Sequence, residues 1–390
     1  MKKIIIILSV ALIGGTLLSQ ARTSLKQIEN SIEEVRAKYA PDKRQAVFEV
    51  QPFAAKDNKI GIKGKISDRT AYDYLKEALA PYGSEIVDMI EVMPEDSWAQ
   101  PRISVACIRV NPSHGAEMAT QAIMGQPLRV LEKDDDWYRV QTPDGYIGWV
   151  TGSSIVPKSS SDMSQWRSNP DRLVVTSPYQ TRVWATEKTQ NLREVVSDLV
   201  NGNIVTGKYN AKKSRILVTL PDGRQGWVDP RDVTPIDQWA AQDFNPDVIL
   251  DIAYSMEGTP YLWGGTSVKS LDCSGLAKVS YLANGIILMR DASQQALTGT
   301  RIEAKDWPTL QAGDLLFFGN AKTGRVTHVA IYDHDGNYVH SSGRVKRNSV
   351  DPKSDSYLST PFLHAVRIHG NEGTKGITQA RNHPWYFNIK

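Results

Sequence analysis

The first hundred residues alternate between helix-like and strand-like spacing of apolar positions. In some stretches apolar side chains recur at steps of three and four, which predicts amphipathic helices; in others they alternate with polar side chains, as in half-buried strands. Ser67 and Asp68 have side-chain oxygens suited to cap the second helix. The predicted elements are, in chain order, a helix over residues 23–38, strands over 46–51 and 59–65, a helix over 67–79 and a strand over 86–92. We therefore expect an N-terminal α/β domain over residues 22–101, whose pattern indicates packing and no particular chemistry.

A short segment then occurs twice. Residues 142–150 (Thr-Pro-Asp-Gly-Tyr-Ile-Gly-Trp-Val) match residues 220–228 (Leu-Pro-Asp-Gly-Arg-Gln-Gly-Trp-Val) at an offset of 78 residues. Pro-Asp-Gly favours a tight turn between two strands, and the Gly-Trp-Val that follows places a large ring on the second strand. Alternating apolar strands precede each copy. We expect two small β-barrels, over residues 104–157 and 171–235, with the tryptophan of each copy packed in its core.

The pattern changes again at about residue 245. Helices are predicted over residues 247–256 and 274–284. The strand-like stretches that follow are residues 315–318, 327–332, 338–340 and 365–368. Helices followed by an antiparallel sheet are typical of an α+β domain, which we expect over residues 245–370. The chain then has a tail, residues 371–390, whose aromatic residues suggest packing on this domain or on a partner.

The N-terminus has the parts of an export signal. Two lysines precede an apolar run over residues 4–18, and Ser19 and Ala21 supply small residues before a cleavage site. We expect a signal peptide over residues 1–21 and export to the periplasm or out of the cell; an uncleaved anchor is the alternative. No cysteine follows the run, which excludes a lipoprotein anchor, and no second stretch is long enough to span a membrane. The net charge of +3 gives no reason to expect nucleic acid as a partner.

The sequence has two cysteines, Cys107 and Cys273. Cys107 lies in an apolar stretch, where we expect a buried and inert side chain rather than a disulfide. Cys273 comes directly before a predicted helix, in the segment Asp-Cys-Ser-Gly. A thiol at this end of a helix is near the positive pole of the helix dipole, which favours the nucleophilic thiolate. Cys273 is therefore a candidate nucleophile; the alternative is a small buried side chain.

Two histidines lie on strands that a hairpin turn connects. His328 interrupts an apolar strand pattern, so its ring needs a polar partner. His340 lies on the next strand, and residues 334–337 (His-Asp-Gly-Asn) are a strong hairpin turn signal. The hairpin brings the two strands together, so that one imidazole can support the other; the sequence does not fix their register. His334, in the turn itself, is expected to be solvated.

Together these residues resemble the NlpC/P60 family of cell-wall cysteine peptidases. The resemblance rests on four segments that stand in the family's order. They are residues 260–265 (Pro-Tyr-Leu-Trp-Gly-Gly), 272–275 (Asp-Cys-Ser-Gly), 313–318 (Gly-Asp-Leu-Leu-Phe-Phe) and 328–332 (His-Val-Ala-Ile-Tyr). The resemblance implies a papain-like fold and a catalytic triad of Cys273, His328 and His340. The repeated Gly-Trp-Val segments resemble bacterial SH3-like domains.

The order of domains is also informative. Two SH3-like domains before the peptidase domain resemble the γ-D-glutamyl-L-diamino acid endopeptidases, also called dipeptidyl-peptidase VI. The resemblance implies cleavage of the γ-D-Glu–L-Lys or γ-D-Glu–meso-diaminopimelate bond in murein peptides with a free N-terminal L-Ala, and release of L-Ala-D-Glu. It also implies that the first SH3-like domain helps to recognise the free amine. The substrate-binding residues that it implies are Asp291, Ser274, Glu117, Tyr146, Asp272 and Trp263. Ala292 follows Asp291, so a hydroxyl donor expected there is missing.

The implied reaction uses few residues. Cys273 attacks the γ-carbonyl, His328 acts as general base and then as acid, and His340 orients the ring of His328. Carboxylates such as Asp291 and Glu117 suit an ammonium group in a confined site. No metal or other cofactor is expected, and the expected partner is a murein peptide or the cell wall. Two alternatives stay open: an endopeptidase or amidase of intact murein that is anchored by the SH3-like pair, and a non-catalytic wall-binding protein.

Overall fold

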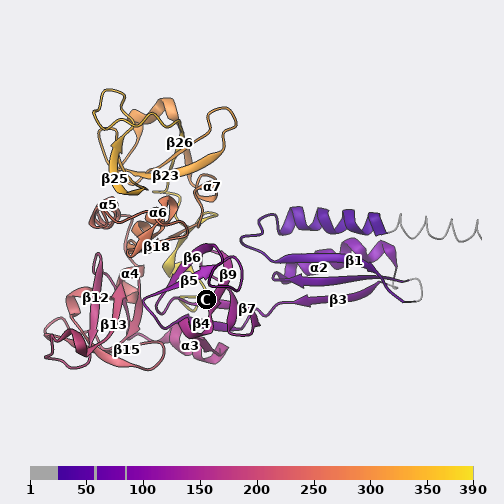
Figure 1. Ribbon diagram of the computed structural model, residues 1–390, viewed down its shortest axis with the longest axis horizontal. Coiled ribbons are helices and arrows are strands. Elements are labelled where there is room, and N and C mark those ends of the chain that lie inside the picture. The colour runs from indigo at the N-terminus through magenta and orange to yellow at the C-terminus, as the bar shows by residue number, and fades with distance from the viewer. Residues whose placement is uncertain (1–24, 57–58, 84–85, 390) are drawn as a thin grey trace, which may run out of the picture. The chain divides into compact units, whose positions relative to one another are not determined.

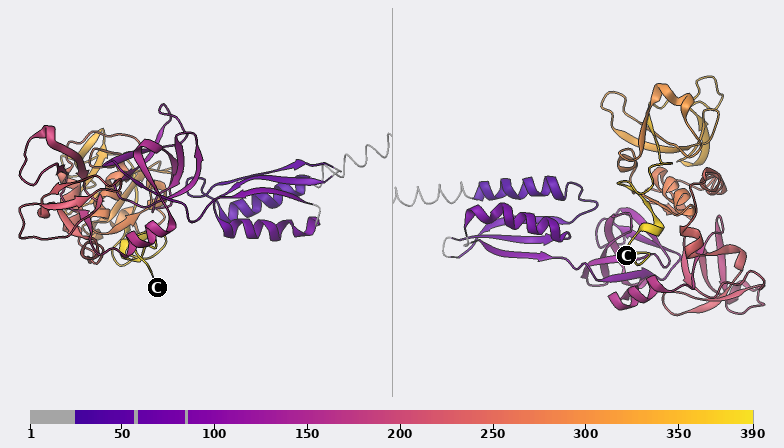
Figure 2. Two further views of the ribbon diagram at one scale, coloured as in Figure 1. Left: turned by 90° about the horizontal axis from the view of Figure 1, so that it is seen from below. Right: turned by 180° about the vertical axis from the view of Figure 1, so that it is seen from behind.

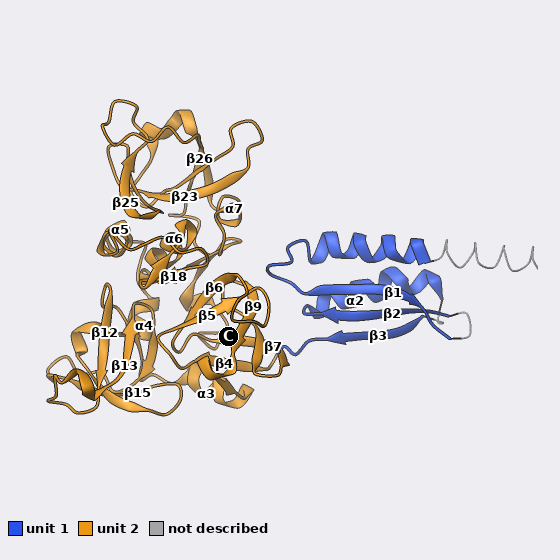
Figure 3. Ribbon diagram, viewed as in Figure 1, with its two compact units in different colours: residues 1–95 blue, residues 96–390 orange. Residues whose placement is uncertain are grey.

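The computed structural model describes residues 25–56, 59–83 and 86–389. The predicted signal peptide, residues 1–21, lies outside these ranges. The chain forms two compact units, residues 1–95 and residues 96–390 (Figures 1 and 3). Among the helices of the described residues, none is long and apolar enough to cross a membrane.

The first unit combines two helices with a three-stranded sheet. Its elements are a helix over residues 25–39, β1 (Phe48–Ala54), β2 (Ile60–Ile66), α2 (Arg69–Leu79), the 3₁₀ turn η1 (Ala80–Tyr82) and β3 (Val87–Val92). Strands β1 and β2 are antiparallel, and β3 is parallel to β2. Both helices lie on one face of the sheet (Figure 2), where Ile28, Ile32 and Leu75 fill the core. Asp68 caps α2 by accepting a hydrogen bond from the N–H of Ala71, so the predicted cap is confirmed.

The second unit begins with a domain that contains the first copy of the repeat. Its strands are β4 (Trp98–Pro101), β5 (Val105–Arg109), β6 (Met118–Ile123), β7 (Leu128–Asp134), β8 (Trp137–Gln141), β9 (Ile147–Thr151) and β10 (Ile155–Lys158). They form one sheet in the order β10-β4-β7-β8-β9-β5-β6. We call residues 98–158 the first β-domain. Strand β4 belongs to it, although the sequence pattern placed this strand in the N-terminal domain, because β4 pairs with β7 and β10.

The second copy of the repeat lies in a matching domain. Helix α3 (Ser160–Ser168) leads from the first β-domain into it. Its strands are β11 (Arg172–Val175), β12 (Gln180–Trp184), β13 (Val195–Val200), β14 (Ile204–Thr206), β15 (Ile216–Thr219), β16 (Gln225–Val228) and β17 (Val233–Pro235). Their order is β13-β12-β16-β15-β14-β11-β17. We call residues 172–235 the second β-domain.

The glycine of the repeated Gly-Trp-Val has the same structural role in both β-domains. A Cβ atom at Gly148 would lie 2.8 Å from a carbonyl oxygen of β5, and one at Gly226 would lie 2.7 Å from a carbonyl oxygen of β12. Glycine therefore lets a neighbouring strand approach at backbone distance. Val150 and Val228 are buried in the two cores. The tryptophans before them are only half-buried, which corrects the expectation that they fill the cores, because side chains alternate between the faces of a strand.

The same alternation corrects the expectation for Cys107. Its neighbours Ala106 and Ile108 on β5 are fully buried, whereas Cys107 is exposed on the opposite face. The apolar stretch thus indicated a strand with a buried face, but not which residues occupy that face.

The rest of the second unit is the α+β domain that the sequence predicted. Its helices are α4 (Ile236–Ala240), α5 (Pro246–Ser255), α6 (Cys273–Ala283) and α7 (Ala292–Gln295). Its strands are β18 (Thr266–Ser267), β19 (Ser270–Leu271), β20 (Ile286–Leu288), β21 (Thr300–Glu303), β22 (Leu315–Gly319), β23 (Val326–Tyr332), β24 (Asn337–Ser342), β25 (Arg344–Ser349), β26 (Phe362–Arg367) and β27 (Ile377–Gln379). Six of them form an antiparallel sheet in the order β21-β26-β22-β23-β24-β25. Leu276 of α6 and Val329 of β23 belong to one hydrophobic core, which packs the helix on the sheet.

The C-terminal tail packs on its own chain. Strand β27 pairs with β20, and Tyr386 is buried beside Trp239. The guanidinium of Arg172, from the second β-domain, donates a hydrogen bond to the backbone carbonyl of Tyr386 at 2.6 Å. The tail therefore ties the α+β domain to the second β-domain.

Candidate active site

Helix α6 begins at the thiol because Asp272 caps it. One carboxylate oxygen of Asp272 accepts a hydrogen bond from the N–H of Gly275 at 2.7 Å, and the other accepts from the N–H of Gly264 at 3.0 Å. The first contact satisfies an amide that has no partner inside the helix. The second joins the loop that contains Gly264 to the start of the helix. Cys273, the first residue of α6, is 8% exposed.

The glycines around Cys273 allow three backbone segments to pack together. A Cβ atom at Gly275 would lie 1.9 Å from the carbonyl oxygen of Gly265, so the first turn of α6 touches the loop before it. Gly264 has a φ of +82°, and a Cβ atom there would lie 2.3 Å from the carbonyl oxygen of Met118 in the first β-domain. No other residue fits these positions without moving the backbone. The two glycine-containing motifs therefore fix where the thiol lies.

A buried arginine, which sequence reasoning missed, completes this support. One terminal nitrogen of Arg290 donates to Asp272 at 3.1 Å and to the hydroxyl of Ser274 at 3.0 Å. Ser274 in turn donates to Asp272 at 3.2 Å. Although burial lowers it, the neighbouring Asp272 carboxylate raises the pKa of Arg290 above its ordinary value. Asp272 and Ser274, both expected to bind substrate, thus have their polar atoms engaged inside the protein.

The two strand histidines are in direct contact. Nε2 of His328 is 2.7 Å from Nδ1 of His340, and the rings meet edge to face. The hairpin turn at Asp335 and Gly336 has the positive φ angles, 52° and 81°, that its sequence predicted. On its other side, Nε2 of His340 is 2.9 Å from Oδ1 of Asn348 on β25. His340 is 1% exposed, so this contact is inside the protein.

The thiol lies next to β23. The backbone N–H of Val329, the residue after His328, faces the sulfur of Cys273. Burial, followed by the neighbouring Asp272 carboxylate, raises the pKa of the Cys273 thiol to about 11. Burial lowers the pKa of His328 to about 3 and that of His340 to about 4. At pH 7 the thiol is therefore protonated and both rings are neutral. The helix dipole favours the thiolate, but burial disfavours it more strongly. Neutral His328 is available as a base.

The first β-domain reaches the same region through two contacts. The hydroxyl of Tyr146 donates to Oδ2 of Asp291 at 3.2 Å, and Asp291 directly precedes α7. The indole N–H of Trp263 donates to Glu117 at 2.6 Å. Trp263 is 61% exposed and Glu117 is also exposed, whereas Ala292 is buried. Four of the residues that the sequence suggested for substrate binding are thus paired across the two domains.

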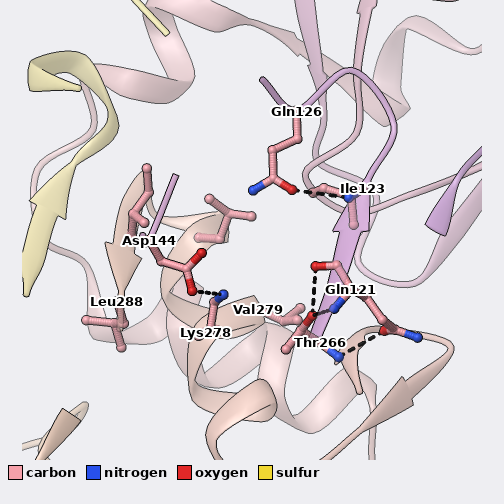
Figure 4. Close-up of a pocket in the computed structure, with 10 residues that line it drawn as sticks. Gln121, Ile123, Gln126, Asp144, Thr266, Lys278, Val279 and Leu288 are labelled. Carbon is pink, nitrogen blue, oxygen red and sulfur yellow. Dashed lines mark hydrogen bonds and ion pairs between the residues drawn. The ribbon is translucent and has the colours of Figure 1, made fainter. Parts of the chain in front are cut away.

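A buried interface holds the first β-domain against α6 (Figure 4). The ammonium of Lys278 on α6 is 2.6 Å from a carboxylate oxygen of Asp144, two residues before Tyr146. Beside this pair, the backbone N–H of Thr266 donates to the side chain of Gln121 at 2.9 Å. Both contacts line a cavity of about 30 Å³, which is large enough for one or two water molecules. The interface is therefore polar and closely packed.

Comparison with known protein families agrees with this architecture. Residues 258–367 match the NlpC/P60 family, and residues 108–155 match the bacterial dipeptidyl-peptidase SH3 domain.

Similar proteins and a solved structure extend the match to more than half of the chain. The chain is 36% identical over 231 residues to a γ-D-glutamyl-L-lysine dipeptidyl-peptidase of Bacillus subtilis strain 168, covering 57% of this chain and 71% of that protein. It is 28% identical over 281 residues to a protein of the same name from Bacillus cereus strain ATCC 10987, covering 69% and 79%. The crystal structure of an NlpC/P60 family protein from Bacillus cereus ATCC 10987 has the same fold, with a TM-score of 0.57 at 22% identity over 69% of this chain and 99% of that one. On its identity to the Bacillus subtilis protein, the chain belongs to the NlpC/P60 family of peptidases.

Proposed function

We propose that this protein is a cysteine peptidase that hydrolyses the γ-D-Glu–L-Lys or γ-D-Glu–meso-diaminopimelate bond of murein peptides with a free N-terminal L-Ala. The product is L-Ala-D-Glu. One observation carries the proposal: Tyr146 of the first β-domain meets Asp291 beside the helix that starts at Cys273. A separate domain thus contributes to the region where the N-terminal end of a short peptide would bind. Two relatives named as γ-D-glutamyl-L-lysine dipeptidyl-peptidases support the same substrate class.

The proposed reaction proceeds through a thioester. The sulfur of Cys273 attacks the γ-carbonyl carbon of D-Glu while neutral His328 takes the thiol proton. Because the thiol is protonated at pH 7, attack and proton transfer are coupled. The backbone N–H of Cys273, which has no carbonyl acceptor within its helix, donates to the oxyanion. The C–N bond then breaks, His328 protonates the leaving amine of the diamino acid, and water hydrolyses the thioester to release L-Ala-D-Glu.

Recognition of the free amine is assigned to carboxylates. Asp291 lies at the contact between the two domains, and the Tyr146 hydroxyl orients one of its oxygens. Glu117 is held by the indole of Trp263 in the same way. An ammonium group that is removed from water needs such a charged acceptor, and an acetylated amine would gain nothing from it. The proposal therefore predicts selectivity for a free N-terminus.

Export is part of the same proposal. The N-terminal residues 1–21 have the pattern of a signal peptide. We propose that the mature protein acts in the periplasm or outside the cell.

The test compares L-Ala-γ-D-Glu-L-Lys with its N-acetylated form, and mass spectrometry follows the release of the N-terminal dipeptide. Cleavage of the free-amine peptide alone is expected, and Cys273→Ala should abolish it while the circular dichroism spectrum stays unchanged. Asp291→Asn should raise KM for the free-amine peptide. Equal cleavage of both peptides would contradict the amine selectivity but keep the peptidase. Cleavage of intact murein alone would favour an endopeptidase or amidase of the cell wall.

A further inference from the structure

A chain of hydrogen bonds runs from His328 across three adjacent strands. Nε2 of His328 contacts Nδ1 of His340 at 2.7 Å, and Nε2 of His340 contacts Oδ1 of Asn348 at 2.9 Å. The side-chain N–H₂ of Asn348 donates to the backbone carbonyl of Ser356 at 2.8 Å. The register of β24 and β25 pairs His340 with Lys346, so Asn348 is two residues along and on the same face of the sheet.

The hydrogen bond between Asn348 and Ser356, at the far end of this series, can have only one direction. A backbone carbonyl accepts hydrogen bonds and cannot donate them. The carbonyl of Ser356 is also held by the backbone N–H of Ser349 at 3.0 Å, so its direction is fixed. The amide of Asn348 must therefore turn its N–H₂ toward Ser356 and its oxygen toward His340. The opposite orientation would place two oxygen acceptors 2.8 Å apart.

The orientation of the Asn348 amide determines which nitrogen carries the proton in both histidine rings. Because Oδ1 of Asn348 accepts, Nε2 of His340 must carry the proton. In a neutral imidazole the other nitrogen is then an acceptor, so Nδ1 of His340 receives the N–H of His328 Nε2. Nδ1 of His328 is left without a proton. We infer that Asn348 is a positioning residue that sets the tautomer of both histidines and so leaves His328 Nδ1 as the base for Cys273.

The opposite direction of these hydrogen bonds is the state that Asn348 prevents. If His340 carried its proton on Nδ1, it would donate to His328 Nε2, and the proton of His328 would move to Nδ1. Since His340 takes up Nε2 of His328, Nδ1 is the ring nitrogen left to accept the thiol proton, and it would then be a donor. In Ser–His–Asp enzymes, losing the group that fixes the histidine tautomer costs roughly 10⁴-fold in kcat. Because Asn348 acts through a second ring, we expect a smaller loss, on the order of 10- to 100-fold, as for other outer partners that orient a histidine.

The inference rests on the proposed function, and its test has a readout that needs no turnover. The ring nitrogens of the wild-type chain, labelled with ¹⁵N-histidine, should show His328 and His340 protonated at Nε2. Asn348→Leu removes the acceptor and should give mixed tautomers, with a lower kcat and an unchanged KM for L-Ala-γ-D-Glu-L-Lys. Asn348→Asp keeps an acceptor toward His340 and should retain the wild-type tautomers and most of kcat. It should be less stable than the wild type, because its second oxygen replaces the N–H₂ that donates to the carbonyl of Ser356.

Ser354→Ala is the matched control, because Ser354 contacts the hydroxyl of Ser356 at 3.0 Å but does not touch the amide of Asn348. It should leave the tautomers and kcat unchanged. Wild-type tautomers in Asn348→Leu would overturn the inference, and so would an equal loss of kcat in Asn348→Asp and Asn348→Leu. If Asn348→Leu does not fold, the wild-type tautomers and the Asn348→Asp variant still decide the question. Correct tautomers in a wild-type chain that cleaves no peptide would instead count against the proposed function alone.

Discussion

The buried ion pair between the first β-domain and α6 offers a quantitative test of how the residues proposed to bind substrate are held. The carboxylate of Asp144 is 2.6 Å from the ammonium of Lys278, and their side chains are 1% and 14% exposed. Asp144 also accepts a hydrogen bond from the hydroxyl of Thr142 at 2.5 Å. The variant Asp144→Asn keeps the shape of the side chain and the contact with Thr142, but leaves the ammonium without a carboxylate.

The expected loss of stability follows from the burial of the pair. Burial raises the pKa of Asp144, but the Lys278 ammonium and the hydrogen bonds outweigh it and hold the pKa below its ordinary value. Asp144 is therefore ionised at pH 7. Removing one partner of a buried ion pair costs ~3–5 kcal/mol. Because part of Lys278 reaches solvent, we expect the lower end, ~3 kcal/mol, which is roughly a 10²-fold change in an equilibrium constant.

A double-mutant cycle isolates the pair. Asp144→Asn and Lys278→Met should each lower the free energy of unfolding in urea at pH 7, measured by circular dichroism. The double variant has no buried charge and should lose less than the sum of the two. Because Tyr146 is on the same turn as Asp144, KM for the free-amine tripeptide should rise in the single variants, with kcat retained. Additive losses of stability, or a fall in kcat at constant KM, would refute the reasoning.

Three further predictions concern the thiol and the histidines. Gly275→Ala should lower the free energy of unfolding by ~1–3 kcal/mol or more and remove most of the activity, because the new Cβ meets the backbone of Gly265. The control in the same urea and peptide assays is Gly115→Ala, where a Cβ meets nothing within 4 Å. Since burial lowers the pKa of His340 to about 4 from 6.5, only the unfolded state binds this proton between those pH values. Stability should therefore fall by up to ~3 kcal/mol as the pH drops from 6.5 to 4, and His340→Asn should remove that part of the slope in thermal unfolding; an identical slope would contradict it. Burial raises the pKa of Cys273 to about 11, so its alkylation by iodoacetamide in a Cys107→Ser background should keep rising with pH above 8; a plateau below pH 7 would mean a preformed thiolate.

The sequence was most informative where structure is local. The helix that Asp68 caps and the hairpin at Asp335 were both predicted, because caps and tight turns depend on a few neighbouring side chains. Residues 98–101 were placed in the N-terminal domain and not recognised as a strand, since the partners of β4, which are β7 and β10, are distant along the chain. Strand β25 was not predicted, because Arg344–Ser349 is mostly polar and has no clear alternation. Non-local pairing leaves no such mark in a single sequence.

The same contrast between local and non-local structure applies to the candidate site. Cys273, His328 and His340 were found from motifs, and the hairpin predicted that the two rings could meet. Arg290 and Asn348 were missed, because each acts only through a contact across the fold. A charged residue beside Asp291, or a polar residue on a polar strand, has no distinguishing pattern. The direction of the hydrogen bonds between the histidines can be assigned only when the acceptor at the end of the series, the carbonyl of Ser356, is known.

The motifs that identified the site mark mostly its support rather than its chemistry. In Asp-Cys-Ser-Gly, Asp272 caps α6 and pairs with Arg290, Ser274 bonds to both, and Gly275 admits a neighbouring carbonyl. These residues hold the thiol at a fixed place, and their exchange should therefore reduce kcat through geometry and stability together. In the proposed function, selection of substrate depends on contacts that lie outside the motif, at the edge of the first β-domain. We therefore expect the two properties to change independently. Changes at that edge should alter which N-terminus is accepted, whereas changes in the motif should remove the reaction for every substrate.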